Sequence, residues 1–401
     1  MNSFSSAVST GDISQKRALD LCLALGKINS GMRCICLPEG SSGHAISLLL
    51  ESVIKSSGHC VGRITSVSGF DSRNSIFVDG EVPSIEDYNL AVAELKSAVN
   101  KNPEAGYTKE ETTFALGLLL CKVSGCECVI LEGLSGKNFA LDAVCAPFDL
   151  IVMPTVYDGE RAAEKVKTLC DAIRRGTREV VSGNQKSEVY NTISNACAIS
   201  GVRLYIPVKA QFEVGETTSR KMTFSYNGRE GFSLRSPSHI LRDCAMTVIE
   251  SALALRRGGV RLPWNCIESG LSAVSETLCL DILAVSPMIL VDSASGYDEV
   301  RMVGKTIEDV FGQNALNEVV FCIPEESLEA LEALGDIDAS ETVIFSKSGG
   351  DFPENSVICD SVKKAAKEIT TRWKNGKDVI CLGSTGFALE IKSEILKLIN
   401  G

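Results

Sequence analysis

The chain has 401 residues, enough for two or three domains of about 100–200 residues each. Its formal net charge of −11 argues against binding to nucleic acid or to an anionic membrane surface, because both are negatively charged. No apolar run reaches the ~18–20 residues that a membrane helix needs. The serine-rich start Met1–Thr10 lacks the pattern of a secretory signal, so we expect a cytoplasmic protein.

The predicted elements of the first part alternate between apolar strand-like runs and helical patterns. Predicted helices are Ala18–Leu25, Ala45–Ser56, 84–99, a helix that opens at Thr108, and Arg161–Arg174. Predicted strands are Arg33–Leu37, Val61–Ser66, Ser75–Val78, Cys128–Leu131, Leu150–Val152, Glu179–Val181 and Arg203–Ile206. Between the fourth and fifth of these strands, residues 132–137 are expected to form a turn.

A polar, β-rich region follows at Gln211–Phe232, with Asn227-Gly228 as a hairpin turn. Two helices are predicted next, at Pro237–Leu255 and at Cys266–Val274, with Asn265 as the N-cap candidate of the second. After a compositional shift near Ala284–Pro287 the alternation restarts. Its strands are Met288–Val291, Glu318–Ile323, Thr342–Phe345 and Asp378–Leu382, and its helices are Tyr297–Phe311, Glu326–Leu334, Val362–Trp373 and Leu389–Leu398.

Strands that alternate with helices imply crossover connections and a mostly parallel sheet. We therefore predict an α/β protein with one domain at residues 1–285 and a smaller α/β domain at 286–401. The sixteen cysteines lie mostly in apolar runs and are interpreted as reduced core thiols. The pairs Cys34/Cys36 and Cys126/Cys128 are compatible with metal binding, but the chain has only three histidines to complete such a site.

The loop after the first predicted strand resembles a phosphate-binding loop in which key residues are replaced. It runs from Pro38 to Ser47, contains two glycines and leads into an apolar helix. Backbone N–H groups of such a loop and the helix N-terminus can bind phosphates. A working loop also needs a lysine and a Ser/Thr hydroxyl, and here His44 stands at the lysine position while Ile46 stands at the hydroxyl position.

The segment Arg17–Val99, which contains this loop, resembles the folylpolyglutamate synthase/dihydrofolate synthase family, a branch of the Mur-ligase superfamily. The resemblance includes the strand 62–66 and the stretch Phe77–Ser84, and near the C-terminus Cys381–Ser384 matches the family's last strand and turn. It implies a P-loop or Rossmann-like parallel-sheet central domain followed by a smaller Rossmann-like domain, with a ligand cleft between them. It also implies ATP and Mg²⁺ as cofactors, in a reaction that joins glutamate to a folate.

Carrying the family's sites over gives a set of candidate residues. The nucleotide-binding candidates are Gly40, Ser41, Ser42, Gly43, His44, Ser47, His239, Asp243 and Asp292. Arg73 is the substrate-binding candidate and Glu132 is the candidate metal ligand. Simpler roles stand beside these: a polar loop residue for His44, a turn-capping carboxylate for Glu132, an ordinary helix residue for His239 and a solvated arginine for Arg73.

Several family positions carry other residues here, so the resemblance implies an altered site. The metal-binding histidine is missing from Val156–Gly159, Asp243 stands in place of an asparagine, and Arg174 or Arg175 stands where a lysine would be carbamylated. Three functions stay open. The leading one is a family member without normal ATP-dependent ligase activity that binds a small ligand, either folate-like or a nucleotide. The others are an active amide ligase and a regulatory protein with a protein partner.

Overall fold

The structure is a computed structural model that describes residues 12–38, 40, 42–65, 73–134, 144–157, 166–167, 169–313, 315–334, 341–346, 352 and 356–400. The chain forms two compact units. The first combines residues within 1–155, 163–207 and 246–271, and the second combines residues within 156–162, 208–245 and 272–401. The predicted domain boundary after residue 285 stays a prediction.

A seven-stranded sheet is the centre of the first unit, as the described residues show it. Its strands are β1 (Arg33–Pro38), β2 (Val61–Thr65), β3 (Ile76–Val78), β4 (Cys128–Leu134), β5 (Leu150–Met153), β6 (Glu179–Ser182) and β7 (Arg203–Tyr205). Their order is β3-β2-β4-β1-β5-β6-β7. All neighbours are parallel except β3, which runs antiparallel to β2. Strand β4 therefore lies between β1 and β2.

Helices α2 (Gly43–Ser56) and α4 (Lys109–Val123) cover opposite faces of this sheet. Successive side chains of a strand point to opposite faces. On β2, Gly62 and Ile64 face α4, because a Cβ at Gly62 would lie 2.2 Å from the Cys121 sulfur and Ile64 lies against Gly117. Arg63, between them, points to the other face and bonds Glu51 of α2.

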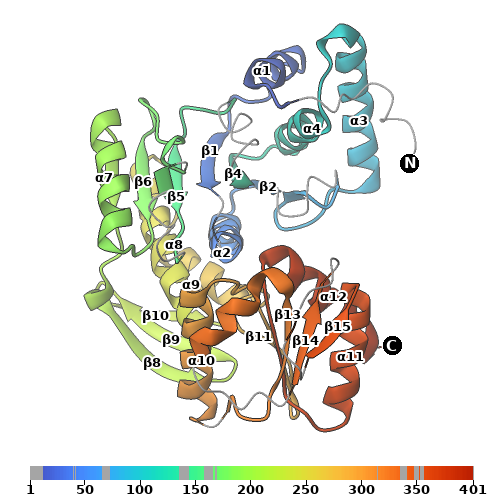
Figure 1. Cartoon of the computed structure of the whole chain (residues 1–401). Coiled ribbons are helices and arrows are strands. Elements are labelled where there is room, and N and C mark those ends of the chain that lie inside the picture. Colours follow the sequence, from blue (N-terminus) through green and yellow to red (C-terminus); the bar gives the residue numbers. More distant parts are fainter. Residues whose placement is uncertain are drawn as a thin grey trace. The chain divides into compact units, whose positions relative to one another are not determined.

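Further helices pack around the first sheet. Figure 1 shows α1 (Gln15–Ala24), α3 (Ile85–Asn100) and α4 side by side, which their mutual contacts confirm. Thr108 caps α4 by accepting a hydrogen bond from the Glu111 N–H, while the Glu111 carboxylate accepts from the Thr108 N–H. The remaining elements are α7 (Ser187–Ser200), α9 (Trp264–Ala273) and the short 3₁₀ helix η1 (Pro103–Ala105).

The second unit contains two sheets. The smaller one is antiparallel, with the order β10-β9-β8, and is formed by β8 (Phe212–Thr218), β9 (Lys221–Tyr226) and β10 (Arg229–Leu234). The larger one has the order β11-β12-β16-β13-β14-β15. Its strands are β11 (Asp281–Val285), β12 (Met288–Asp292), β13 (Val320–Pro324), β14 (Glu341–Phe345), β15 (Ser356–Cys359) and β16 (Val379–Leu382). Only β11 is antiparallel to its neighbour.

Helices complete the second unit. They are α10 (Tyr297–Phe311), α11 (Val362–Lys374) and α12 (Thr385–Asn400), with the 3₁₀ helices η4 (Lys209–Gln211) and η5 (Glu325–Leu334). Helix α8 (His239–Arg257) begins in the second unit and ends in the first. Apolar side chains of β12, β13 and β16 pack against α11 and α12 in one buried cluster. Burial of strands by helices explains their near-continuous apolar sequences.

The α/β class predicted from the sequence is confirmed, and several local predictions are corrected. Helix α7 was not predicted, because its sequence is polar and rich in β-branched residues and only Val189, Ile193 and Cys197 are buried. Strands β11 and β15 were not predicted. Asn265 is not an N-cap, because α9 already begins at Trp264. The helix predicted at Glu326–Leu334 is a 3₁₀ helix over residues 325–334.

Two further differences concern the first unit. Glu132 and Gly133 belong to β4 and not to a turn. Of the predicted helix at 161–174, residues 161–165 and 168 lie outside the described part of the chain. Residues 166–167 and 169–170 are helical, and Arg174 lies in a segment without regular structure that leads to β6. None of the helices that the structure describes has both the length and the apolar character needed to cross a membrane.

Candidate functional site

The glycine loop joins β1 to α2 at the carboxyl edge of the first sheet. Gly40 lies against the residue that follows β5, since a Cβ there would be 3.0 Å from the Pro154 side chain. This close approach explains the need for glycine. Gly43 begins α2. Of the candidate loop residues, Ser41 lies outside the described part of the chain, whereas Gly40, Ser42, Gly43, His44 and Ser47 are described.

The structure brings two of these loop and helix residues to the carboxylate of Glu132 at the end of β4. The His44 Nδ1 lies 2.8 Å from Glu132 Oε1, and the Ser47 hydroxyl donates to Glu132 Oε2 at 2.6 Å. An ionised carboxylate only accepts hydrogen bonds, so the hydrogen of this contact lies on Nδ1 of His44. Three residues from two separate segments therefore meet in one polar cluster.

The cation of the cluster is Arg63 of β2. Its Nη1 donates to Glu132 Oε2 at 2.9 Å, and its Nε donates to Glu51 Oε2 at 2.8 Å. The Arg63 guanidinium also stacks over the ring of Phe77, with 4.2 Å between its carbon and the ring centroid. Only 4% of the Arg63 side chain is exposed, so this arginine is a buried charge held by two carboxylates.

Glu51 connects the cluster to the turn after β3. Its Oε1 accepts the Gly80 N–H at 2.9 Å, while its other oxygen holds Arg63. Asp79, in the same turn, accepts the Val61 N–H at 2.9 Å. The polar cluster, which we define as His44, Ser47, Glu51, Arg63 and Glu132, is thus anchored to backbone as well as to itself.

The charges in this cluster stabilise one another. Burial raises the pKa of Glu132, but His44 and Arg63 outweigh this effect and lower it to about 2. Burial lowers the pKa of Arg63, but Glu132 and Glu51 overcompensate and raise it. Because each ionised group has partners at hydrogen-bond distance, all of them can stay charged without contact with water.

Sequence reasoning missed Arg63 and Glu51 as site residues. Two signals point to them. Glu51 follows His44 and Ser47 at a spacing that puts all three on one helical face. Arg63 is a charged residue in a strand buried along its full length. A charge inside such a strand is unusual and needs a partner.

A Mg²⁺ ion, which the family resemblance implies, does not fit this donor set. Mg²⁺ needs oxygen ligands in near-octahedral geometry. Both Glu132 oxygens already accept hydrogen bonds. The Arg63 guanidinium, bonded to one of them, would repel a metal cation at the same carboxylate. Among the residues that the structure describes, no group of three or more His, Cys, Asp or Glu side chains is arranged to hold a metal.

Two candidates of the second unit lie on α8. His239 opens the helix, and its Nε2 is 3.4 Å from the Asp309 carboxylate. Burial and the nearby Arg242 lower the pKa of His239. The buried Asp243 is paired with Arg242 at 3.3 Å and with Lys209 at 3.2 Å. Both residues have partners within the unit, which accounts for their positions without a ligand.

Asp292, the third candidate there, is buried at the end of β12 and binds backbone. Its oxygens accept the Leu280 N–H at 2.7 Å and the Ala294 N–H at 2.8 Å. Burial raises the pKa of Asp292 to about 8, and the two N–H groups oppose this shift. Leu280 has a positive φ of 60°, so Asp292 fixes a loop in an uncommon conformation.

Arg73, the substrate-binding candidate, donates from Nε and Nη2 to the Pro83 carbonyl at 3.1 and 3.0 Å. These bonds hold together the two ends of the β3 turn segment. Parts of two segments used in the family comparison, Ser66 of the strand 62–66 and residues 158–159 of Val156–Gly159, lie outside the described residues. Whether the candidate residues bind nucleotide or substrate stays a prediction.

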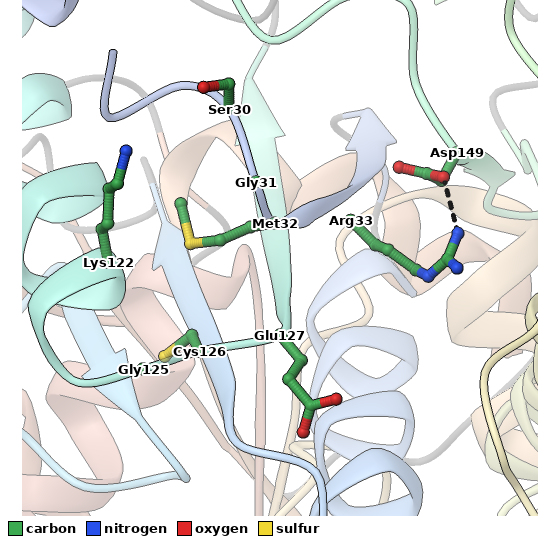
Figure 2. A pocket seen from close by; sticks show the side chains of 9 residues that line it. All are labelled: Ser30, Gly31, Met32, Arg33, Lys122, Gly125, Cys126, Glu127 and Asp149. Atoms are coloured by element: carbon green, nitrogen blue, oxygen red, sulfur yellow. Dashed lines mark hydrogen bonds and ion pairs between the residues drawn. The ribbon is translucent and has the colours of Figure 1, made fainter. Parts of the chain in front are cut away.

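A hollow of about 640 Å³ lies at the opposite edge of the first sheet, where β1, β4 and β5 begin (Figure 2). Figure 2 shows Arg33 and Asp149 pointing toward each other at one side of it, with 3.1 Å between guanidinium and carboxylate. Lys122 donates to the Gly26 and Lys27 carbonyls, and Glu127 is 3.0 Å from His59. The charged groups of this hollow are therefore paired within the chain, and we assign it no ligand.

No protein-family model and no curated protein matches the chain. Solved structures do match over nearly its whole length. One is a Mycobacterium tuberculosis folylpolyglutamate synthase complexed with ADP and AMPPCP, with 14% identity, 95% of both chains covered and a TM-score of 0.77. Another is a Lactobacillus casei folylpolyglutamate synthetase, with 17% identity, 97% of both chains covered and a TM-score of 0.76.

A folylpolyglutamate synthase from Thermotoga maritima matches at 17% identity with a TM-score of 0.74, covering 95% of this chain and 93% of that one. At such low identity the likeness concerns the fold. It confirms the fold that the resemblance of Arg17–Val99 predicted, and the chain has the α/β fold of the folylpolyglutamate synthases.

Proposed function

We propose that this chain is a divergent relative of the folylpolyglutamate synthases that has lost ATP- and Mg²⁺-dependent ligation and binds a small nucleotide- or folate-like ligand. One observation supports the loss above all others. Glu132, the candidate metal ligand, is bonded to His44, Ser47 and Arg63 in a buried cluster. The carboxylate that would hold the metal is already neutralised by the protein.

The chemistry of ligation explains why this matters. Forming an acyl phosphate from ATP requires cations that neutralise phosphate charge in the transition state. The loop offers His44 at the lysine position, and its ring is bonded to Glu132. The Arg63 guanidinium is buried between two carboxylates. Loss of one stabilising group typically costs about 10²–10³-fold in rate, so the loss of both lysine and metal leaves little activity.

The ligand classes come from the structural relatives. One of the matched structures is complexed with ADP and AMPPCP, and another is an AMPPCP–folate complex. Function depends on the site and not on the fold, so binding of these ligands has to be tested on this chain itself. Nucleotide and folate are therefore the probes with which to test this chain.

Two measurements on the purified chain test the proposal. The first follows ADP release from ATP in the presence of Mg²⁺, glutamate and a reduced folate, and we expect none above the background of a Glu132→Gln control. The second follows thermal unfolding with AMPPCP or folate, and we expect a higher midpoint with at least one of them. A ligand at a hundredfold excess over its Kd stabilises the native state by about 2.7 kcal/mol.

ADP release that requires both glutamate and folate, and that is lost in the Glu132→Gln variant, contradicts the loss of ligation. The active ligase would then be the correct function. A midpoint that moves with neither AMPPCP nor folate contradicts the ligand-binding half of the proposal.

A further inference from the structure

We propose that Arg63 is a built-in cation that takes the place of a divalent metal at Glu132, so that this edge of the sheet excludes metal ions. This inference rests on the proposed function and gives it a physical cause. It concerns the polar cluster of His44, Ser47, Glu51, Arg63 and Glu132, which lies where the carboxyl ends of β2 and β4 meet the start of α2.

The strand order puts Arg63 in this position. Strand β4 lies between β2 and β1, so Glu132 has Arg63 on one side and the loop after β1 on the other. Arg63 pairs with Ile130 in the ladder, two residues before Glu132 on the same face of the sheet. Its long side chain reaches Glu132 Oε2 at 2.9 Å, which is the length of a strong charge-assisted bond.

The donors around Glu132 leave a metal no favourable place. A Mg²⁺ ion would bind a carboxylate oxygen at about 2.0–2.1 Å, close to the fixed positive charge of Arg63. It would also displace the Ser47 hydroxyl, which donates to Oε2 at 2.6 Å, or the His44 ring, which lies 2.8 Å from Oε1. At most 4% of the Glu51, Arg63 and Glu132 side chains is exposed, so water cannot easily compensate for these losses.

The charge balance predicts what removal of Arg63 does. Arg63 contributes one positive charge against the two negative charges of Glu51 and Glu132. Without it, two carboxylates stay buried with no permanent cation between them. Like charges that share a site are unstable together, and a divalent cation would neutralise both. Removal of Arg63 should therefore create a metal site from residues that already surround it.

Manganese titration of the wild-type chain and of Arg63→Met tests this directly, with bound Mn²⁺ measured by electron paramagnetic resonance. Methionine keeps an unbranched side chain without the charge. We expect no saturable binding to the wild type and one bound Mn²⁺ in Arg63→Met, together with a rise in the thermal midpoint of the variant when Mn²⁺ is added. The double variant Arg63→Met/Glu132→Gln should lose the bound ion.

A matched control is Arg33→Met. Arg33 also pairs with a carboxylate, Asp149, but at the opposite edge of the sheet. We expect this variant to bind no Mn²⁺, which would show that loss of an arginine does not by itself create a metal site.

Wild-type protein that binds Mn²⁺, and loses it in Glu132→Gln, overturns the proposal. A folded Arg63→Met that binds no Mn²⁺ also overturns it. If Arg63→Met does not fold, the wild type and Glu132→Gln alone decide: equal absence of binding supports metal exclusion, and binding that depends on Glu132 refutes it. These readouts measure bound metal and not ADP, so ligase activity without bound metal would contradict only the proposed function.

Discussion

Glu132 shows at the scale of one residue how the protein keeps a charge in its interior. Three donors from two helical positions and a neighbouring strand surround its carboxylate. The sequence predicted that this residue matters, and it offered metal binding and capping as alternatives. The structure shows a third arrangement, an ion pair with Arg63, because the partner comes from a strand 69 positions away in the chain.

Glu132→Gln should destabilise the protein by about 3 kcal/mol at neutral pH, because it leaves Arg63 with one carboxylate fewer in a buried site. The effect should depend on pH. The folded-state pKa of Glu132 is lowered to about 2 from an ordinary value of 4.5. Its stabilisation is therefore fully present above about pH 4.5 and is lost as the pH falls toward 2.

Urea unfolding of wild type and Glu132→Gln at a series of pH values measures this difference. The gap in unfolding free energy should narrow below about pH 4.5. A gap that is the same at pH 3 and pH 7 would show that the Glu132 charge contributes nothing to the difference.

At the scale of elements, the contact between α2 and α9 depends on a single glycine. A Cβ at Gly270 of α9 would lie 2.5 Å from the Val53 Cα and 2.7 Å from the Val53 nitrogen, both in α2. The Ser52 hydroxyl donates to the Gly270 carbonyl at 2.8 Å across the same contact. The helix α2, which carries His44, Ser47 and Glu51, is thus held by close contact between its own backbone and the backbone of α9.

Gly270→Ala should destabilise the protein by about 1–3 kcal/mol, because the new methyl group meets backbone atoms that cannot rotate away. Gly386→Ala is the matched control. Gly386 lies in α12 with nothing within 4 Å of an added Cβ, so alanine there should be neutral or stabilising by up to about 1 kcal/mol. Denaturant midpoints of both variants test this, and equal effects would mean that the α2–α9 contact adapts freely.

The elements also show what local patterns can predict. Most strands were found because burial under helices leaves them apolar throughout, as in β1, β5 and β16. Helix α7 was missed because only three of its residues are buried, one per turn, and such a short apolar stripe gives a weak helical pattern. Strand β11 was missed because it overlaps the compositional shift near Ala284–Pro287, from which the restart of the strand and helix alternation was placed at Met288.

At the scale of the whole molecule, the sixteen cysteines act as part of the core. All sixteen lie in the described part of the chain and are free thiols, and thirteen of them are buried. The three that are partly exposed are Cys60, Cys170 and Cys266. Burial raises the pKa of Cys60 to about 12, and neighbouring Cys126, whose sulfur is 3.4 Å away, adds to this shift.

A thiol reagent should therefore modify at most three cysteines of the native protein and all sixteen in denaturant. The reaction of Cys60 should be slow at neutral pH, since the thiolate is the reactive form. Mass spectrometry of the labelled protein counts the modified sites. Rapid modification of many cysteines under native conditions would contradict the burial of the other thirteen thiols in the core.

The sequence by itself determined the α/β class, most strands and the position of the glycine loop between β1 and α2. These depend on local periodicity and on residue types in order along the chain, which are present in the sequence. Only the tertiary structure decided the partners of Glu132. His44 and Ser47 follow β1, Arg63 belongs to β2 and Glu132 lies near the end of β4. They meet because the sheet order places β4 between β1 and β2, and strand order is a property of the fold that no local pattern specifies.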